Sequence, residues 1–182
     1  MIIRLAGFGG QGIVMSSYIL GQSAALDGKK AIQNQSYGSE SRGGECRGDV
    51  IISDQDIYEL EPSMFDILVA IAQPAYEKFI PFLKPGGTLI VDKDLVITDD
   101  ANEPENIKKH AISATDIAFT KFNRKIIANM IILGYLNRLS NLISPEVLEQ
   151  VISENVPPGT QEVNLKAMRE GISLAEQELA TA

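Results

Sequence analysis

The stretch Ile2-Ile3-Arg4-Leu5-Ala6-Gly7-Phe8-Gly9-Gly10-Gln11-Gly12 is the most informative part of this chain. Its apolar first half predicts a buried strand over residues 2–6. The glycine-rich half precedes a helical pattern over residues 11–27, so it predicts a strand-to-helix turn whose bare backbone can approach a ligand closely. The candidate binding residues of this turn are Gly7, Gly9, Gly10, Gln11 and Gly12.

A second glycine-rich segment, Tyr37-Gly38-Ser39-Glu40-Ser41-Arg42-Gly43-Gly44, follows after the next expected strand. It places an arginine, whose planar fork can bind phosphate bidentately, among residues that tolerate unusual backbone angles. Arg47 can add to the same cationic surface. The alternative is a solvated loop in which arginines pair with neighbouring glutamates. The candidate binding residues here are Tyr37, Gly38, Arg42, Gly43 and Gly44.

The composition limits the number of domains, the partners and the compartment that the chain can have. The chain has 182 residues, of which 45% are hydrophobic, and no linker divides it, so we expect one domain over residues 1–182. The net charge of -8 disfavours nucleic acid and anionic membranes as partners. The single cysteine, Cys46, permits no internal disulfide and no cysteine-ligated cluster. We expect a cytoplasmic protein, with neither a signal peptide nor a membrane-spanning segment.

Strand and helix patterns alternate along the chain and predict an α/β fold. We expect a Rossmann-like three-layer sandwich, with a mostly parallel sheet, helices on both faces and a helical C-terminal part. The expected strands are residues 2–6, 31–35, 49–53, 66–71, 88–91 and, more briefly, 111–114. The expected helices are residues 11–27, 75–83, 124–140, 146–154 and 161–179, with a turn at 84–87. The apolar helix around residues 126–136 belongs either to the domain's own core or also to a subunit contact.

A dinucleotide site is the first interpretation of the glycine turn, with a pyrophosphate at the helix N-terminus. That site needs an acidic residue at the end of the second strand, where this chain has Ile32-Gln33-Asn34-Gln35-Ser36. The dinucleotide pattern is therefore incomplete. Gln11 occupies a position usually left to small or apolar residues, so we expect its amide to act within the turn. A turn that binds nothing is a further alternative.

Taken together, these motifs resemble the gamma subunit of 2-oxoacid:ferredoxin oxidoreductases. The resemblance rests on residues 9–13, on Tyr37 to Gly44, and on the segments 50–53, 66–70, 83–87 and 129–134 in the same order. It extends over nearly the whole chain. The sequence of residues 35–44 looks most like that of gamma subunits of the 2-oxoglutarate type, whereas gamma subunits of the pyruvate and indolepyruvate types vary around the same arginine.

The resemblance implies oxidative decarboxylation of a 2-oxoacid, giving an acyl-CoA and reduced ferredoxin. It implies that thiamine diphosphate, magnesium and iron–sulfur clusters lie on partner subunits (alpha, beta and a ferredoxin-like delta) and that none is bound by this chain. It also implies that this chain helps to bind coenzyme A and has no catalytic residue of its own. A helix N-terminus and an arginine suit the phosphates of coenzyme A. The alternatives are a free-standing NAD(P)- or nucleotide-dependent enzyme and a scaffold that only joins subunits.

Other chemistry-bearing residues have plainer interpretations. His110, the only histidine, is expected in a solvated loop and not as a base, because no nucleophile lies near it in sequence. Cys46 is a possible reactive thiol only if neighbouring arginines lower its pKa. Asp92 and Asp94 follow a strand and are expected as turn and helix-cap residues rather than as metal ligands.

Overall fold

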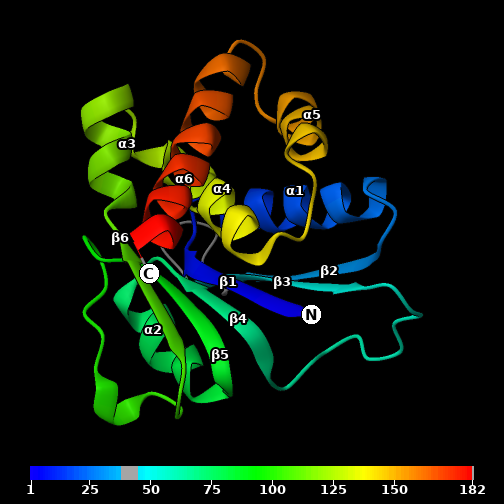
Figure 1. Cartoon of the computed structure of the whole chain (residues 1–182), viewed down its shortest axis with the longest axis vertical. Coiled ribbons are helices and arrows are strands. Elements are labelled where there is room, and N and C mark those ends of the chain that lie inside the picture. The colour runs from blue at the N-terminus through cyan, green and yellow to red at the C-terminus, as the bar shows by residue number, and fades with distance from the viewer. Residues whose placement is uncertain (38–44, 182) are drawn as a thin grey trace.

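The computed structural model describes residues 1–37 and 45–181. The described strands form one six-stranded sheet in the order β2-β3-β1-β4-β5-β6 (Figure 1). The strands are β1 (Ile2–Phe8), β2 (Lys30–Tyr37), β3 (Glu45–Ser53), β4 (Phe65–Ala70), β5 (Leu83–Asp92) and β6 (Lys108–Ile112). The α-helices are α1 (Ile13–Leu26), α2 (Gln73–Phe79), α3 (Ala114–Phe122), α4 (Ala128–Ser140), α5 (Pro145–Asn155) and α6 (Gln161–Thr181). Short 3-10 turns cover Ile80–Phe82, Asp100–Asn102 and Lys125–Ile127.

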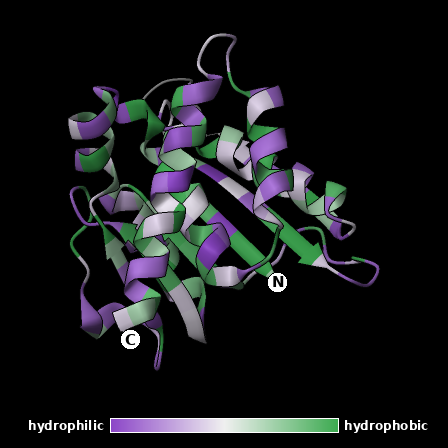
Figure 2. Cartoon of the chain, turned by 45° about the horizontal axis from the view of Figure 1, so that its top comes forward, coloured by the Kyte–Doolittle hydropathy of each residue, from purple (hydrophilic) through white to green (hydrophobic). Residues whose placement is uncertain are grey.

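The helices cover both faces of the sheet, as the sequence predicted. Helices α1, α4, α5 and α6 contribute to a large apolar core on one face, and α2 packs on a smaller core on the other. Figure 2 shows apolar residues continuing along central strands, whereas the helices alternate between apolar and polar. Such alternation is expected for helices that cover a sheet on one side and meet water on the other. The predicted three-layer α/β sandwich is therefore confirmed.

The sheet is mixed, and one part of the predicted strand pattern is wrong. Strand β1 pairs in parallel with β4, β4 with β5, and β5 with β6. Strand β3 instead runs antiparallel to both β1 and β2. A parallel crossover needs about a dozen or more residues, and residues 38–44, between β2 and β3, are too few for one. Because β1 and β2 are both antiparallel to β3, they run in the same direction with α1 between them, so the expected strand–helix–strand pattern is interrupted only at β3.

A second difference concerns the region after β5. We expected a turn at 84–87 and a strand at 111–114, but β5 already begins at Leu83 and β6 ends at Ile112. Helix α3, which follows at once, was not predicted. Strand β6 lies at the edge of the sheet, and most of its side chains are exposed or half-buried. Its polar composition therefore hides the alternation by which a half-buried strand is recognised.

Helix α4 is buried in the domain's own core, as the first interpretation of its apolar sequence predicted. Met130, Leu133 and Tyr135 are completely buried. A side chain at Gly134 would overlap the Met168 carbonyl of α6, and one at Gly171 of α6 would overlap α4 in the same way. The two helices thus cross with their backbones in contact. Among the described helices, none is long and apolar enough to cross a membrane.

Candidate functional site

The turn between β1 and α1 needs its glycines. Gly10 has φ 97° and Gly12 has φ 77°, both in the left-handed region that favours glycine. Gly12 is the N-cap residue of α1 and has no side chain that could cap the helix, while the Val14 N–H of the first turn faces the Cys46 thiol. The first N–H groups of a helix have no partner within the helix, and they carry a partial positive charge. This end of α1 can therefore receive an anion.

Gln11 holds the turn against the sheet. Its Oε1 accepts a hydrogen bond from the Phe8 N–H at 2.6 Å, and its Nε2 donates to the Ile71 carbonyl at 2.9 Å. These two bonds join the end of β1 to the end of β4. A Cβ at Gly7 would lie 2.6 Å from Gln11 Oε1, so the glycine there leaves room for this amide. The role expected for the Gln11 amide within the turn is thus confirmed.

A cavity of about 370 Å³ opens beside this turn. Most of its wall is apolar, and the one charged side chain among its described lining residues is Arg124, which is exposed. Two buried asparagines, Asn129 of α4 and Asn164 of α6, contribute polar groups. The lining residues are Phe8, Gly9, Gly10, Gly12, Ile13, Val14, Met15, Cys46, Arg124, Ile126, Ile127, Asn129, Pro157, Thr160 and Asn164. We call this space the glycine-turn cavity.

A neighbouring cavity of about 390 Å³ shares Gly10 and Ile126 with the glycine-turn cavity. Gln11 and Lys125 also line it, as does Asp92 at the end of β5. Asp92 accepts hydrogen bonds from the Thr115 N–H at 3.0 Å and the Thr115 hydroxyl at 2.6 Å. Burial raises the pKa of the Asp92 carboxyl. Asp92 therefore holds the first turn of α3, which confirms the expected cap role.

The second glycine-rich segment lies largely outside the described residues. Gly38, Arg42, Gly43 and Gly44 fall within 38–44, and Tyr37 is described only as the last residue of β2. Arg47, which we expected to add to the cationic surface of this segment, lies on the opposite face of the sheet from the glycine-turn cavity. Neighbouring side chains of a strand face opposite sides of the sheet. Cys46 faces the glycine-turn cavity, whereas Arg47 lies over the Phe79 ring of α2 and lines a separate cavity of about 520 Å³.

Cys46 and His110 are not placed for catalysis. Cys46 is 4% exposed, and burial raises the pKa of its thiol, which disfavours the reactive thiolate. His110 lies in β6, so its expected place in a solvated loop is wrong. Its Nδ1 is 2.7 Å from a Glu178 carboxylate oxygen and 3.2 Å from the Tyr135 hydroxyl. This cluster joins the sheet edge to α4 and α6, and none of its three residues lines the glycine-turn cavity.

Sequence reasoning missed three residues of the glycine-turn cavity. Arg124 precedes α4, Asn129 lies in its first turn, and Asn164 lies in the first turn of α6. A weak signal was present for Asn129, since it interrupts an otherwise apolar helix. Nothing in the sequence connected that asparagine to Gly12 or to a residue on the last helix.

The chain has close relatives of known kind. Residues 2–174 match the family model described as pyruvate ferredoxin/flavodoxin oxidoreductase. The chain is 45% identical over 176 residues to the 2-oxoglutarate synthase subunit KorC of Methanocaldococcus jannaschii, which covers 96% of this chain and 94% of that protein.

Two solved structures have the same fold. The keto/oxoacid ferredoxin oxidoreductase gamma subunit of Geobacter sulfurreducens matches with a TM-score of 0.84 and 37% identity, over 97% of this chain and 98% of that chain. The 2-oxoglutarate:ferredoxin oxidoreductase of Magnetococcus marinus, with 2-oxoglutarate, coenzyme A and succinyl-CoA bound, matches with a TM-score of 0.87 and 28% identity. That match covers 97% of this chain but 31% of the other, so there the same fold is part of a longer chain.

Proposed function

Because this chain belongs to the pyruvate ferredoxin/flavodoxin oxidoreductase family, we propose that it is the gamma subunit of a 2-oxoglutarate:ferredoxin oxidoreductase. The observation that carries the proposal is the 45% identity, over nearly the full length of both chains, to a 2-oxoglutarate synthase subunit. A pyruvate synthase subunit of Methanothermobacter marburgensis matches at a lower 30% identity. The family resemblance inferred from the sequence is confirmed, and nothing in these comparisons supports a free-standing nucleotide-dependent enzyme.

The reaction of the whole enzyme is the oxidative decarboxylation of 2-oxoglutarate with coenzyme A, which gives succinyl-CoA and reduced ferredoxin. We assign to this chain the binding of part of coenzyme A at the glycine turn. The uncapped N-terminus of α1 and the guanidinium of Arg124 supply positive charge beside the glycine-turn cavity. The backbone of Gly9, Gly10 and Gly12 allows a phosphate to come close. The coenzyme A bound in the related Magnetococcus marinus enzyme supports this assignment.

The second glycine-rich segment belongs to the same proposal on sequence grounds alone. Arg42 lies between Gly38 and the pair Gly43-Gly44, a setting in which its guanidinium can meet a phosphate bidentately. Tyr37 leads into this segment from β2. We therefore expect Arg42→Ala to raise the KM for coenzyme A in the assembled enzyme while the subunits still associate. An unchanged KM would remove Arg42 from the site.

The redox and carbon chemistry belongs to partner subunits. Iron–sulfur clusters are held by about four cysteine thiolates, and this chain offers only Cys46, which is buried. The residues of this chain therefore do not fit a cluster. We place the clusters, thiamine diphosphate and its magnesium ion on alpha, beta and ferredoxin-like delta subunits, with ferredoxin as the electron acceptor. The fusion of this fold into a longer chain in Magnetococcus marinus supports close association with another subunit.

The direct test is purification of the tagged chain from its own cells under mild conditions. We expect partner chains that contain thiamine diphosphate and iron–sulfur clusters, together with dye reduction that depends on both 2-oxoglutarate and coenzyme A. Activity with pyruvate in place of 2-oxoglutarate would correct the substrate only. A protein that purifies without partners and retains a nucleotide would contradict the proposal.

A further inference from the structure

Asn129 and Asn164 stand out among the residues of the glycine-turn cavity. Each is 7% exposed, so more than nine-tenths of each residue is buried, yet both line the cavity. Their amide nitrogens are engaged. Asn129 Nδ2 donates to the Gly12 carbonyl at 3.4 Å, and Asn164 Nδ2 donates to the Thr160 carbonyl at 2.8 Å.

The amide oxygens of these two residues have no hydrogen-bond partner in the described part of the chain. Neither oxygen is among the fully buried unpaired side-chain atoms of the described residues, which are Ser16 Oγ and Ser23 Oγ, so both oxygens keep some access to solvent, and both residues line the cavity. An acceptor in a mostly apolar cavity is normally satisfied by water or by a ligand. Asn137, which lies on the same helix as Asn129 and is 3% exposed, shows the usual arrangement. Its Nδ2 donates to the Ile143 carbonyl at 2.9 Å, and its Oδ1 accepts from the Ile143 N–H at 3.1 Å.

The position of Asn129 is fixed by the glycine turn itself. A side chain at Gly12 would overlap the Asn129 amide, so the turn and this asparagine fit closely together. Asn164 lies on a different helix and is held through Thr160, with Nδ2 also 3.1 Å from the Thr160 hydroxyl. Two acceptor oxygens from separate helices are therefore held beside the same apolar space.

We infer that Asn129 and Asn164 accept hydrogen bonds from neutral N–H groups of the ligand in the glycine-turn cavity. This inference rests on the proposed function, in which the ligand is coenzyme A. That molecule has two amide N–H groups in its pantetheine arm and an amino group on adenine, and all three are donors that need an acceptor when they leave water. The apolar wall around the asparagines suits the neutral part of such a ligand.

The choice of asparagine over aspartate agrees with this role. A carboxylate would accept the same hydrogen bonds, but its charge would repel phosphates held nearby by Arg124 and the N-terminus of α1. The described lining of the cavity contains no carboxylate. The amide oxygen thus accepts from the ligand without opposing the anion site.

The test uses the assembled enzyme and the variants Asn129→Leu and Asn164→Leu. Loss of one neutral hydrogen bond to a ligand should raise the KM for coenzyme A by about 3- to 10-fold, with kcat changed by less than about twofold because no reacting group is touched. Asn137→Leu is the matched control, since both of its polar atoms are used within the fold. It should lower thermal stability and leave the KM unchanged.

Ligand analogues identify the donor. One set replaces a pantetheine amide N–H with a methylene group, and another carries hypoxanthine in place of adenine. The analogue that lacks the relevant donor should bind to the wild-type enzyme less well than coenzyme A does. To the leucine variant that lacks the matching acceptor, the same analogue should bind no less well than coenzyme A does. If every analogue loses the same factor with wild type and variants, the inference is wrong.

Two outcomes separate this inference from the proposed function. An enzyme that depends on coenzyme A, but whose KM is unchanged in both leucine variants, overturns the inference and leaves the function standing. An assembled enzyme with no dependence on coenzyme A overturns the function. If a leucine variant fails to assemble, Asn164→Asp is used in its place, because it keeps the size of the side chain. This variant should raise the KM for coenzyme A by about tenfold or more, since its carboxylate repels the nearby phosphates. An unchanged KM in Asn164→Asp also overturns the inference.

Discussion

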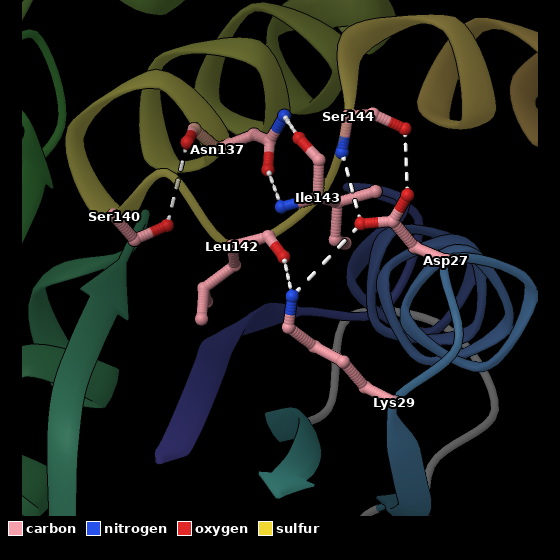
Figure 3. Close-up of polar contacts among 7 residues, drawn as sticks. All are labelled: Asp27, Lys29, Asn137, Ser140, Leu142, Ile143 and Ser144. Carbon is pink, nitrogen blue, oxygen red and sulfur yellow. Dashed lines mark hydrogen bonds and ion pairs between the residues drawn. The ribbon is translucent and has the colours of Figure 1, made fainter. Parts of the chain in front are cut away.

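The two cap residues of helix α1 differ: Gly12 at the N-terminus has no side chain, whereas the carboxylate of Asp27 at the C-terminus is held by another part of the chain (Figure 3). Asp27 accepts hydrogen bonds from the Ser144 hydroxyl at 2.6 Å and from the Ser144 N–H at 3.2 Å. Lys29 donates to the Leu142 carbonyl at 2.7 Å. At the other end, donors of the first turn and the oxygen of Asn129 lie beside a cavity.

The loop between α4 and α5 contributes further hydrogen bonds beside the C-terminal end of α1. Asn137 exchanges two hydrogen bonds with Ile143, and the Ser140 hydroxyl is 3.5 Å from the Asn137 carbonyl (Figure 3). The same hydroxyl donates to the Leu136 carbonyl at 2.7 Å. We call this group of contacts the α1–α5 junction. Its polar groups satisfy one another, so it needs no ligand to be stable. The C-terminal end of α1 thus stabilises the fold, whereas its N-terminal end is open to a ligand. The two ends differ in whether their polar atoms have hydrogen-bond partners within the chain.

The sharpest test of this difference uses two asparagines of α4. We expect Asn137→Ala to lower the free energy of unfolding by about 2–3 kcal/mol, because it leaves the buried N–H and carbonyl of Ile143 without partners. Asn129→Ala removes one long hydrogen bond and should cost less than about 1 kcal/mol. Urea unfolding of the full chain measures both. Equal losses would show that the cavity end is as structural as the junction.

Glycines at the two ends of α1 provide a second test. Gly12 and Gly28 both have positive φ, at 77° and 85°, so alanine at either position should cost about 1–2 kcal/mol in backbone strain. A side chain at Gly12 also overlaps Asn129, whereas one at Gly28 meets nothing within 4 Å. We therefore expect Gly12→Ala, and not Gly28→Ala, to raise the KM for coenzyme A about fivefold or more. Steady-state kinetics of the assembled enzyme decide this, and a similar KM in both variants would contradict it.

Removal of a charge at the cavity should have a smaller effect. We expect Arg124→Ala to raise the KM for coenzyme A by about 3- to 10-fold, because a charge-assisted contact to phosphate is lost. The increase should shrink as salt is added, since Arg124 is exposed. Arg138→Ala is the control, because it removes the same charge from the far end of α4, where Arg138 pairs with Glu176. A response to salt that is the same in both variants would argue against phosphate binding at Arg124.

The smallest effect concerns the pH dependence of the α1–α5 junction. The hydrogen bond from Ser144 lowers the pKa of Asp27 below its ordinary value of 3.8. The charged form of Asp27 therefore stabilises the fold above that value, and the contribution is lost as the pH falls through the lowered pKa. We expect Asp27→Asn to cost less than about 1 kcal/mol at neutral pH and to flatten the fall in stability below pH 3.8. Thermal unfolding at several pH values tests this, and parallel curves for wild type and variant would rule it out.

Local patterns in the sequence were enough for the part of the fold that carries the glycine turn. Strand β1, the turn and α1 are contiguous, so apolar periodicity and glycine spacing describe them without knowledge of the rest. Helix α3 was missed because its first turn is held by Asp92, which precedes it by more than twenty residues and lies on another element. Tertiary contacts of this kind override local propensity.

The candidate site was predictable only in part, for a similar reason. Gly12, Asn129 and Asn164 come from three separate elements, and only the crossing of α4 and α6 brings the last two to one cavity. The face on which Arg47 lies depends on the register of β3, in which Arg47 pairs with Ala6 of β1. A one-residue change in register would reverse that face, so sequence spacing could not assign Arg47 to a cavity.

The close crossing of α4 and α6 also has a geometrical consequence. A side chain at Gly134 or at Gly171 would overlap the backbone of the other helix, so the two helices are already as near to each other as their backbones allow. Because Asn129 and Asn164 lie on these two closely packed helices, we expect their spacing to change little when a ligand enters the glycine-turn cavity.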